Sequence, residues 1–456
     1  RLTDVTGVQT CALPICLCKE SGLVVPALSL LLVMHYRPPR FLFKHVFGGV
    51  ILQVLAVLVY LTLRYEALGT IAMSGVDPFL RAPSPTSLYM NVSYFLTRYL
   101  VLVLYPVNLS CDYPLAPVSL HWSGALFPGI VLLSAVAFFS RGREARWAGL
   151  GMLWFLLSLL PVLHLVPMQI AMAERFLYPA YPGIALLWGK RLSILPKRYS
   201  LLAALFWGIM LAITFDRCFD WKNNDTVWTS ALQRYPRSYR AKIYLGSKAA
   251  RNGDMQKALE YYEDALRLDP NRDNRILIHQ NQAIVWWKMK KEREALDAIS
   301  RVLEIHPGHS PAWIFLGDVA AEQKRWQEAF DCYEKSRRAR NRWDKEYSLI
   351  LDKKGKCLMA LGEWEKTWRA YRDAIYYDPE NPDLYARSGS ALMEVGKYEE
   401  AVDHLKKGLT LSPRSYVIHY LLSKGYKKLG QMERSRHHYQ NASDFVPKGV
   451  ALPNED

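Results

Sequence analysis

Residues 396–413 read GKYEEAVDHLKKGLTLSP and contain most of a spacing that recurs through the second half of this chain. Gly389 is followed by Ala401 after twelve residues, by Gly408 after nineteen and by Pro413 after twenty-four. The same offsets hold in six successive registers, and the other five begin at Gly246, Ala283, Gly317, Gly355 and Ser423. Small or apolar residues fill the first three positions of each register, and a turn residue fills the fourth.

Small residues at this spacing let two antiparallel helices approach closely, and a proline ends the second helix. The pattern, which returns as LGDVAAEQKRWQEAFDCYEKS at residues 316–336, resembles the tetratricopeptide repeat. It predicts six repeats over residues 238–447, after a junction with a partial repeat at 217–237 and before a tail at 448–456. Such repeats stack into an α-solenoid whose concave surface binds protein or peptide. Aromatic residues are expected to fill the gap beside the small positions: Tyr262, Tyr333, Tyr371 and Tyr439.

Apolar segments dominate the chain before the repeats. A helix needs about 20 apolar residues to cross a hydrocarbon core of about 30 Å. We predict spans at residues 21–34, 46–63, 123–139, 147–165, 176–188 and 201–215. Residues 92–107 contain Arg98 and Pro106, which favours a juxtamembrane or re-entrant helix, and the sequence leaves a full span open; a full span would misplace one of the three short basic loops of the chain. The predicted fold is therefore all-α: a polytopic membrane helix bundle followed by the solenoid.

The orientation follows from three short basic loops, because Lys and Arg favour the cytoplasmic side of a membrane. These loops lie at residues 35–45, 140–147 and 189–200. Placing all three inside puts the loop at residues 64–122, the loop around Glu174 and the whole repeat domain outside. The sequence therefore predicts an integral membrane protein with an extracytoplasmic or lumenal repeat domain.

The loop MAERFLYPAYPG, at residues 172–183, places an acid and an arginine directly before an apolar span. Such charges are costly in a membrane unless they face water, protein or a ligand. The loop follows LLPVLHLVP at residues 159–167, and CKESGLVVPALSLLL stands at residues 18–32. Together with the trailing repeats, these motifs resemble the multispan transmembrane and tetratricopeptide-repeat glycosyltransferases, relatives of the protein O-mannosyltransferases with the GT-C membrane fold.

This resemblance implies a partial GT-C domain at residues 16–216 that uses a polyprenyl-phosphate sugar as its donor. It implies an active site at the outer or lumenal face of a bacterial inner membrane or of the endoplasmic reticulum. Hydroxyl groups of Ser or Thr in proteins would be the acceptors, and the membrane lipid and an acceptor protein would be the partners. We expect no bound cofactor and no metal site, and the sequence leaves a divalent-metal requirement open.

The family's Lys-Glu pair falls on Lys19 and Glu20, and its Ala-Glu-Arg motif with the following aromatic, Leu and Tyr falls on residues 173–178. The planar fork of Arg175 suits bidentate binding of the donor phosphate, with Lys19 as a second charge. Glu174, Glu20 and Tyr178 would support these cations. The alternatives are that Arg175 and Lys19 only extend to the membrane interface, and that Glu174 only pairs with Arg175.

The family's catalytic acidic pair, in the first outer loop, has no counterpart here. Residues 1–15, RLTDVTGVQTCALPI, look like a translated cloning adapter, so we assign no catalysis to Asp4. We expect this chain to be a fragment and predict the activity for its parent. Asp77, Asp112 and Asp216 are weak substitutes, and for Asp112 a solvated loop acid is the favoured interpretation.

The remaining composition adds little to this prediction. The net charge of +16 divides evenly about Asp216, which argues against one basic arm for nucleic acid. The cysteines lack metal-ligand spacing, and Cys111–Cys218 and Cys332–Cys357 disulfides remain as open as free thiols. The alternative function is a membrane-anchored tetratricopeptide-repeat scaffold for protein assembly without catalysis.

Overall fold

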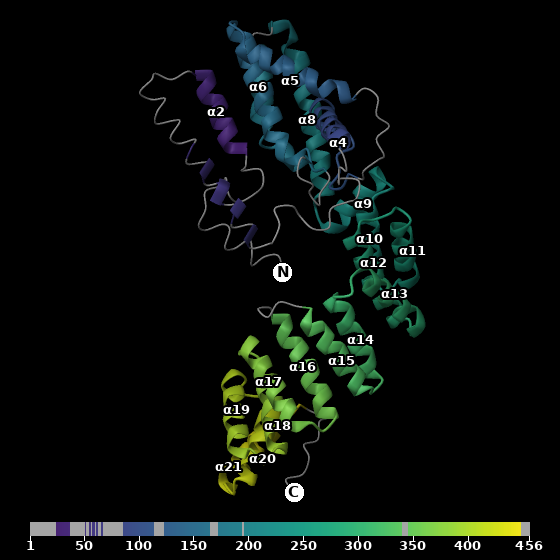
Figure 1. The fold of residues 1–456 in the computed structure, drawn as a ribbon, viewed down its shortest axis with the longest axis vertical. Coiled ribbons are helices and arrows are strands. Elements are labelled where there is room, and N and C mark those ends of the chain that lie inside the picture. The colour runs from purple at the N-terminus through teal and green to yellow at the C-terminus, as the bar shows by residue number, and fades with distance from the viewer. Residues whose placement is uncertain are drawn as a thin grey trace. The chain divides into compact units, whose positions relative to one another are not determined.

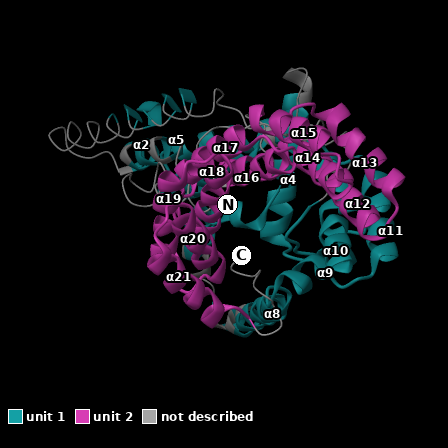
Figure 2. Cartoon of the chain, turned by 90° about the horizontal axis from the view of Figure 1, so that it is seen from below, with its two compact units in different colours: residues 1–278 teal, residues 279–456 magenta. Residues whose placement is uncertain are grey.

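The computed structural model describes residues 24–36, 85–113, 123–164, 172–193, 196–339 and 345–447, with short helical pieces between residues 51 and 66. All regular structure in these ranges is helical. The chain forms two compact units, residues 1–278 and 279–456 (Figures 1 and 2). The predicted segment 1–15, the tail 448–456 and the pair Lys19 and Glu20 lie outside the described residues.

The first unit contains helices at most of the positions where spans are predicted. They are α2 (Val25–Tyr36), α4 (Pro85–Leu104), α5 (Ser123–Phe139), α6 (Arg143–Leu159), α7 (Tyr181–Ser193) and α8 (Ser200–Asp220), with 3-10 turns η4 (Leu160–Val162), η5 (Glu174–Leu177) and η6 (Lys197–Tyr199). Among these described segments, one stretch, Arg143–Val162, has the length and hydropathy for crossing a membrane. Leu88–Leu104 and Pro128–Phe139 are apolar but shorter.

Helix α7 begins later than the predicted span at residues 176–188. Glu174–Leu177 forms a 3-10 turn instead. Pro182 suits the first turn of the helix that begins at Tyr181. Part of the predicted span is therefore a loop, and this loop carries the acid and the arginine.

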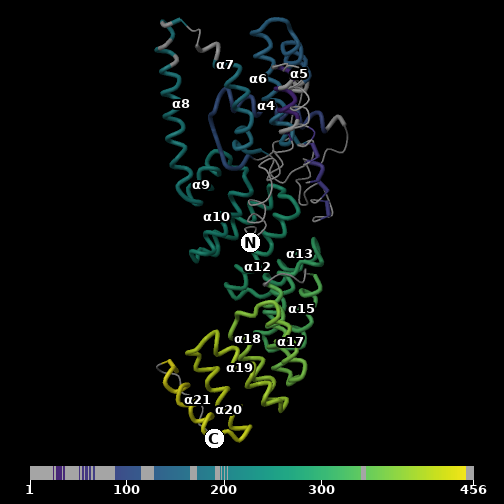
Figure 3. The backbone as a smooth tube through the Cα atoms, turned by 90° about the vertical axis from the view of Figure 1, so that its left-hand side faces the viewer, coloured from purple at the N-terminus to yellow at the C-terminus, as the bar shows by residue number. Residues whose placement is uncertain are grey.

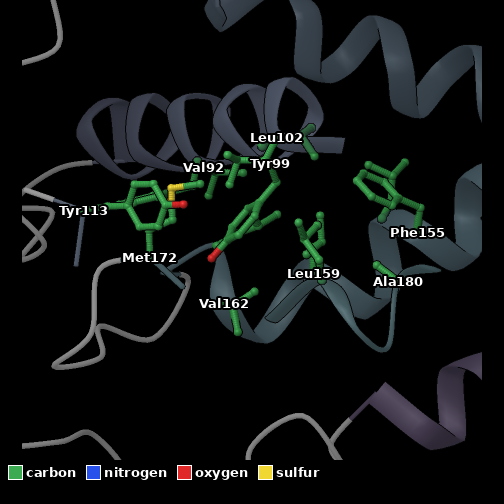
Figure 4. Packing of buried hydrophobic residues seen from close by; sticks show 14 residues of the cluster. Val92, Tyr99, Leu102, Tyr113, Phe155, Leu159, Val162, Met172 and Ala180 are labelled. Atoms are coloured by element: carbon green, nitrogen blue, oxygen red, sulfur yellow. The ribbon is translucent and has the colours of Figure 1, made fainter. Parts of the chain in front are cut away.

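Helices α6 and α7 pack backbone to backbone. A Cβ atom added to Gly151 would lie 2.5 Å from the carbonyl oxygen of Gly183, so only glycine fits there. Beside this contact, residues of α4, α6 and the 172–180 loop form a buried apolar cluster that includes Tyr99, Phe155 and Leu159 (Figure 4). The cluster fixes the loop against α4 and α6.

The repeats are helical hairpins. Helix α9 (Asn224–Arg234) precedes α10 (Tyr239–Arg251) and α11 (Met255–Leu266), and α12 (Arg272–Lys288) continues into the second unit. The later helices follow one another along an arc (Figure 2). They are α13 (Glu292–Ile305), α14 (Ser310–Glu322), α15 (Trp326–Arg338), α16 (Lys345–Ala360), α17 (Trp364–Tyr377), α18 (Pro382–Glu394), α19 (Tyr398–Leu411), α20 (Tyr416–Lys428) and α21 (Met432–Phe445).

The small positions of the repeats are sites of close helix packing, as their spacing predicts. A Cβ atom at Gly355 would lie 2.6 Å from the ring of Tyr371, and one at Gly317 would lie 2.5 Å from the ring of Tyr333. Gly246 and Tyr262 repeat this contact in the first unit. The tyrosine of one helix therefore packs directly on the backbone of its partner helix.

Each hairpin turn contains one residue with positive φ, seven residues after the small position. Four of these residues are glycine, the residue for which this conformation costs least. Lysine occupies the other two, with φ of 60° at Lys290 and 59° at Lys324. The glycines are Gly253, Gly362, Gly396 and Gly430.

The junction between the predicted domains lies within continuous structure. Helix α8 runs from Ser200 to Asp220 and so crosses the predicted boundary after residue 216. The tube in Figure 3 passes from α8 through α9 into α10. Helix α9 occupies the predicted partial repeat, and its N-terminus carries a capping box between Asn223 and Thr226.

Candidate functional site

The loop with the sequence MAERFLYPAYPG is held by its apolar residues. Met172, Leu177 and Ala180 are buried in the cluster with α4 and α6, and Met172 lies beside Tyr113 in Figure 4. Phe176, Tyr178 and Ala180 donate backbone hydrogen bonds to carbonyls three residues earlier. These contacts fix the backbone that carries Glu174 and Arg175.

The Glu174 carboxylate accepts hydrogen bonds from two residues that are distant in sequence. The Tyr113 hydroxyl donates to Oε1 at 2.7 Å, and Arg217 at the end of α8 donates to the same oxygen at 3.3 Å. The alternative in which Glu174 only pairs with Arg175 does not hold in this structure, because the ion-pair partner of Glu174 is Arg217. Burial, and then the Glu174 carboxylate, raise the pKa of Tyr113 well above its ordinary value, so the phenol remains a donor.

Arg175 is exposed, and its guanidinium lies 5.4 Å from the ring centre of Phe176. It forms no ion pair with any residue that the structure describes. An exposed guanidinium on a fixed backbone keeps its donors available for an anion. Tyr178 is 70% exposed and lies near Tyr181, with ring centres 6.5 Å apart, rather than against Glu174.

A chain of ion pairs leads from Glu174 to the first repeat helices. Arg217 donates to Asp220 at 2.8 Å, and Arg234 pairs with the same carboxylate at 2.7 Å. Arg234 also donates to the carbonyl of Leu109 at 2.6 Å. Burial opposes ionisation of Asp220, but hydrogen bonds from Arg217 and Arg234 outweigh it and lower the pKa of this carboxyl.

A second set of contacts joins the loop at residues 105–113 to α10. Asp112 is buried, accepts a hydrogen bond from the Ser238 hydroxyl at 2.6 Å and lies 3.5 Å from Arg240. The interpretation of Asp112 as a solvated loop acid is therefore wrong, because the start of the repeat domain covers it. Asp216 is exposed, and Asp77 lies outside the described residues.

The sequence did not predict that Tyr113 and Arg217 belong to the candidate site. Neither belongs to a motif, and their contacts to Glu174 span 61 and 43 residues of sequence. The predicted topology contained one usable signal, because it places the 174 loop and the end of α8 at the same membrane edge. Opposite charges at one such edge are expected to pair.

The four described cysteines, for which disulfides and free thiols were equally expected, are free thiols. Cys111, Cys218, Cys332 and Cys357 are all unpaired with one another. Burial raises the pKa of the Cys111 thiol to about 11, so it is protonated at neutral pH.

Family models described as tetratricopeptide repeat match residues 226–273, 287–342 and 382–415. These segments are tetratricopeptide repeats. The first match begins within α9, in agreement with a partial repeat before α10.

Curated relatives match more than the repeats. The chain is similar to protein O-mannosyl-transferase TMTC3 from Mus musculus (24% identity, 68% of this chain, 36% of the relative) and from Homo sapiens (23%, 74% and 40%). It also matches protein O-mannosyl-transferase F38B6.6 from Caenorhabditis elegans (26%, 42% and 30%). The predicted family resemblance is confirmed. This chain spans two fifths or less of the length of these relatives.

Proposed function

We propose that this chain is part of an integral-membrane glycosyltransferase that transfers a sugar from a polyprenyl-phosphate donor to protein hydroxyls at the extracytoplasmic face. One observation carries the proposal. Residues 217–456 make up slightly more than half of the chain, whereas the matches to the mouse and human relatives cover 68% and 74% of it. The similarity to the O-mannosyltransferases therefore includes sequence before the repeats, which a likeness between solenoids alone does not explain.

In this proposal Arg175 binds the donor phosphate. Its guanidinium is exposed and stands on a 3-10 turn fixed by the apolar cluster. A planar guanidinium can donate two parallel hydrogen bonds to phosphate oxygens, which fixes the orientation of the lipid headgroup. Lys19, from the family's Lys-Glu pair, would add a second positive charge, with Glu20 as its support.

The membrane location is supported by α8 as well as by the apolar stretch in α6. The side chains of Leu201, Leu205, Trp207, Leu211 and Phe215 are each between 60 and 77% exposed. Continuous apolar surface of this kind is unfavourable in water and is typical of a membrane interaction site. Arg217 and Asp220 follow at the end of α8, where the proposed outer surface begins.

The repeats would bind the acceptor protein. Solenoids of this class present a concave surface to peptides and proteins. The ion pairs from Arg217 to Arg234 hold the first repeat helices beside the proposed donor site. Acceptor hydroxyls bound on the repeats would therefore be delivered to the same face of the membrane.

The test is a sugar-transfer assay in membranes that contain the full-length protein of which this chain is proposed to be a part. Labelled polyprenyl-phosphate mannose serves as donor, and the Arg175→Ala variant is compared with Arg198→Ala. Arg198 is a matched control because it is exposed and lies 4.9 Å from the ring centre of the following Tyr199, but in a predicted cytoplasmic loop. We expect Arg175→Ala to lower the transfer rate by about tenfold or more, the size expected for the loss of one charge-assisted contact, and Arg198→Ala to leave the rate unchanged.

Transfer at the wild-type rate by Arg175→Ala would remove Arg175 from the donor site. Absence of transfer by the wild-type protein with several donor sugars would favour the non-catalytic scaffold. Immunoblots of each membrane preparation control for protein level.

A further inference from the structure

Glu174 directly precedes Arg175, yet its carboxylate is bound elsewhere. Adjacent opposite charges do pair in this chain, because Arg372 lies 3.0 Å from the Asp373 carboxylate. The equivalent contact at residues 174 and 175 would place the Arg175 guanidinium on its neighbour. Tyr113 and Arg217 hold the Glu174 carboxylate instead. Arg175 is thus left available for another anion.

Of these two partners, Arg217 neutralises the charge. Its side chain is only 13% exposed and links Glu174 at 3.3 Å to Asp220 at 2.8 Å. Tyr113 is a neutral donor, so it orients the carboxylate but leaves its charge in place. Because the site is partly buried, an uncompensated carboxylate there attracts a nearby cation more strongly than it would in water.

Substitution of Arg217 would leave Glu174, and not Asp220, without an ion-pair partner in the described part of the chain. Asp220 keeps a second cation, because Arg234 lies 2.7 Å from it. For Glu174, Arg217 is the one ion-pair partner among the described residues. Removal of Arg217 therefore leaves Asp220 paired and Glu174 with Arg175 as the adjacent cation.

We propose that Arg217 is a positioning residue that prevents Glu174 from pairing with Arg175 and so keeps Arg175 free for the donor phosphate. This inference rests on the proposed function. The residue acts from the end of α8, at the start of the connection to the repeats, without contact to the donor. Its effect is on donor binding, exerted through competition for one carboxylate.

The test is a double-mutant rescue, measured as KM for polyprenyl-phosphate mannose in membranes of the full-length protein. Arg217→Gln is expected to raise this KM about tenfold, the size of one charge-assisted contact, with a smaller change in kcat. Adding Glu174→Gln removes the competing carboxylate. The double variant is expected to return to within about threefold of the Glu174→Gln single variant.

A purely structural role for Arg217 gives the opposite result, because a second substitution in the same contact does not restore packing. A double variant as impaired as Arg217→Gln alone would overturn the proposal, and so would a wild-type KM for Arg217→Gln. Arg234→Gln is the matched control. It removes the other cation on Asp220 without touching Glu174, and its donor KM should remain at the wild-type value.

Two further variants complete the set. Arg217→Lys keeps the charge but loses the fork that reaches two carboxylates, so a smaller rise in KM is expected, again removed by Glu174→Gln. This variant carries the test if Arg217→Gln does not accumulate. Arg175→Ala separates the two claims. A wild-type KM for Arg175→Ala would reject the phosphate site, whereas a raised KM with no effect of the Arg217 variants would reject only the role of Arg217.

Discussion

At the scale of single residues, Asp112 is a buried carboxylate with partners from the start of the repeats. Ser238 donates to one of its oxygens, and Ser238 also caps α10 by accepting from the backbone N–H of Ala241. One side chain thus links the 105–113 loop to a helix N-terminus. The sequence could not predict this link, because Asp112 and Ser238 lie 126 positions apart and neither occupies one of the four recurring positions of the repeat.

We predict that Asp112→Ala lowers the free energy of unfolding of the first unit by about 1–3 kcal/mol, because Ser238 loses its acceptor and Arg240 a carboxylate partner. Asp112→Asn keeps an acceptor for Ser238 and should cost less. The measurement is hydrogen exchange of α10 in the whole chain. Asp216→Ala, at an exposed acid, is the control and should stay within about 0.5 kcal/mol. Equal exchange in Asp112→Ala and Asp216→Ala would refute the link.

The last repeat contains a histidine pair that predicts a pH dependence. His438 Nδ1 lies 3.0 Å from His419 Nδ1. Burial, followed by the charges of His419, His437 and Lys406, lowers the pKa of His438 from 6.5 to about 4. Between these values the unfolded chain binds more protons than the folded one, so stability falls as pH drops from 6.5 toward 4.

We therefore expect α20 and α21 to lose hydrogen-exchange protection between pH 6.5 and about 4, relative to α16 and α17 in the same chain. His438→Gln removes the titrating group and should flatten this dependence. An unchanged pH profile in that variant would show that another group is responsible.

At the scale of helices and turns, the sequence periodicity predicted the most. The small positions of the repeats follow from local spacing, and the expected tyrosines pack on them at Tyr262, Tyr333 and Tyr371, whereas Leu405 fills this place beside Gly389. Helix starts at membrane edges were harder to predict, because an apolar run does not distinguish a loop that is buried from a helix. The predicted span at residues 176–188 is the example, because its first two residues end the 3-10 turn at Glu174–Leu177 and its helix begins only at Tyr181.

The turns give a prediction of their own. Lys324 has a φ of 59°, a conformation that costs a non-glycine residue roughly 1 kcal/mol, whereas Gly396 meets the same demand in a later repeat. Lys324→Gly should therefore raise the stability of the α14–α15 hairpin by up to about 1 kcal/mol, less the entropic cost of glycine. Gly396→Ala should lower that of the α18–α19 hairpin by a similar amount. Opposite signs in denaturant titrations of the full chain check the argument, and two changes of the same sign would contradict it.

At the scale of the whole molecule, the order of the parts was predictable from hydropathy and repeats, and the network between them was not. Tyr113 and Arg217 reach the Glu174 carboxylate only after the loop before residue 113, the 174 turn and the end of α8 are brought together. Such contacts depend on tertiary structure, which periodicity does not encode. The predicted topology is the remaining whole-molecule claim, and it places the repeats outside.

This topology predicts glycosylation in a eukaryotic host. The sequon at Asn224 is exposed at the start of α9, so it should be modified if the repeats are lumenal. The expected result is an endoglycosidase-sensitive mobility shift that Asn224→Gln reduces by the mass of one glycan; the sequons at Asn108 and Asn441 lie on the same predicted side. A new sequon placed beside Arg141, in a predicted cytoplasmic loop, should stay unmodified. The reverse pattern would invert the topology.

The most direct test of the central claim is photo-crosslinking of a polyprenyl phosphate with a photoreactive group near its phosphate to the full-length protein in membranes. We predict that mass spectrometry finds the crosslink within residues 172–183, that excess unlabelled donor competes it away, and that Arg175→Ala removes it. A competed crosslink that lies elsewhere, or one that persists in Arg175→Ala at the wild-type level, would contradict the assignment of this loop as the donor-phosphate site.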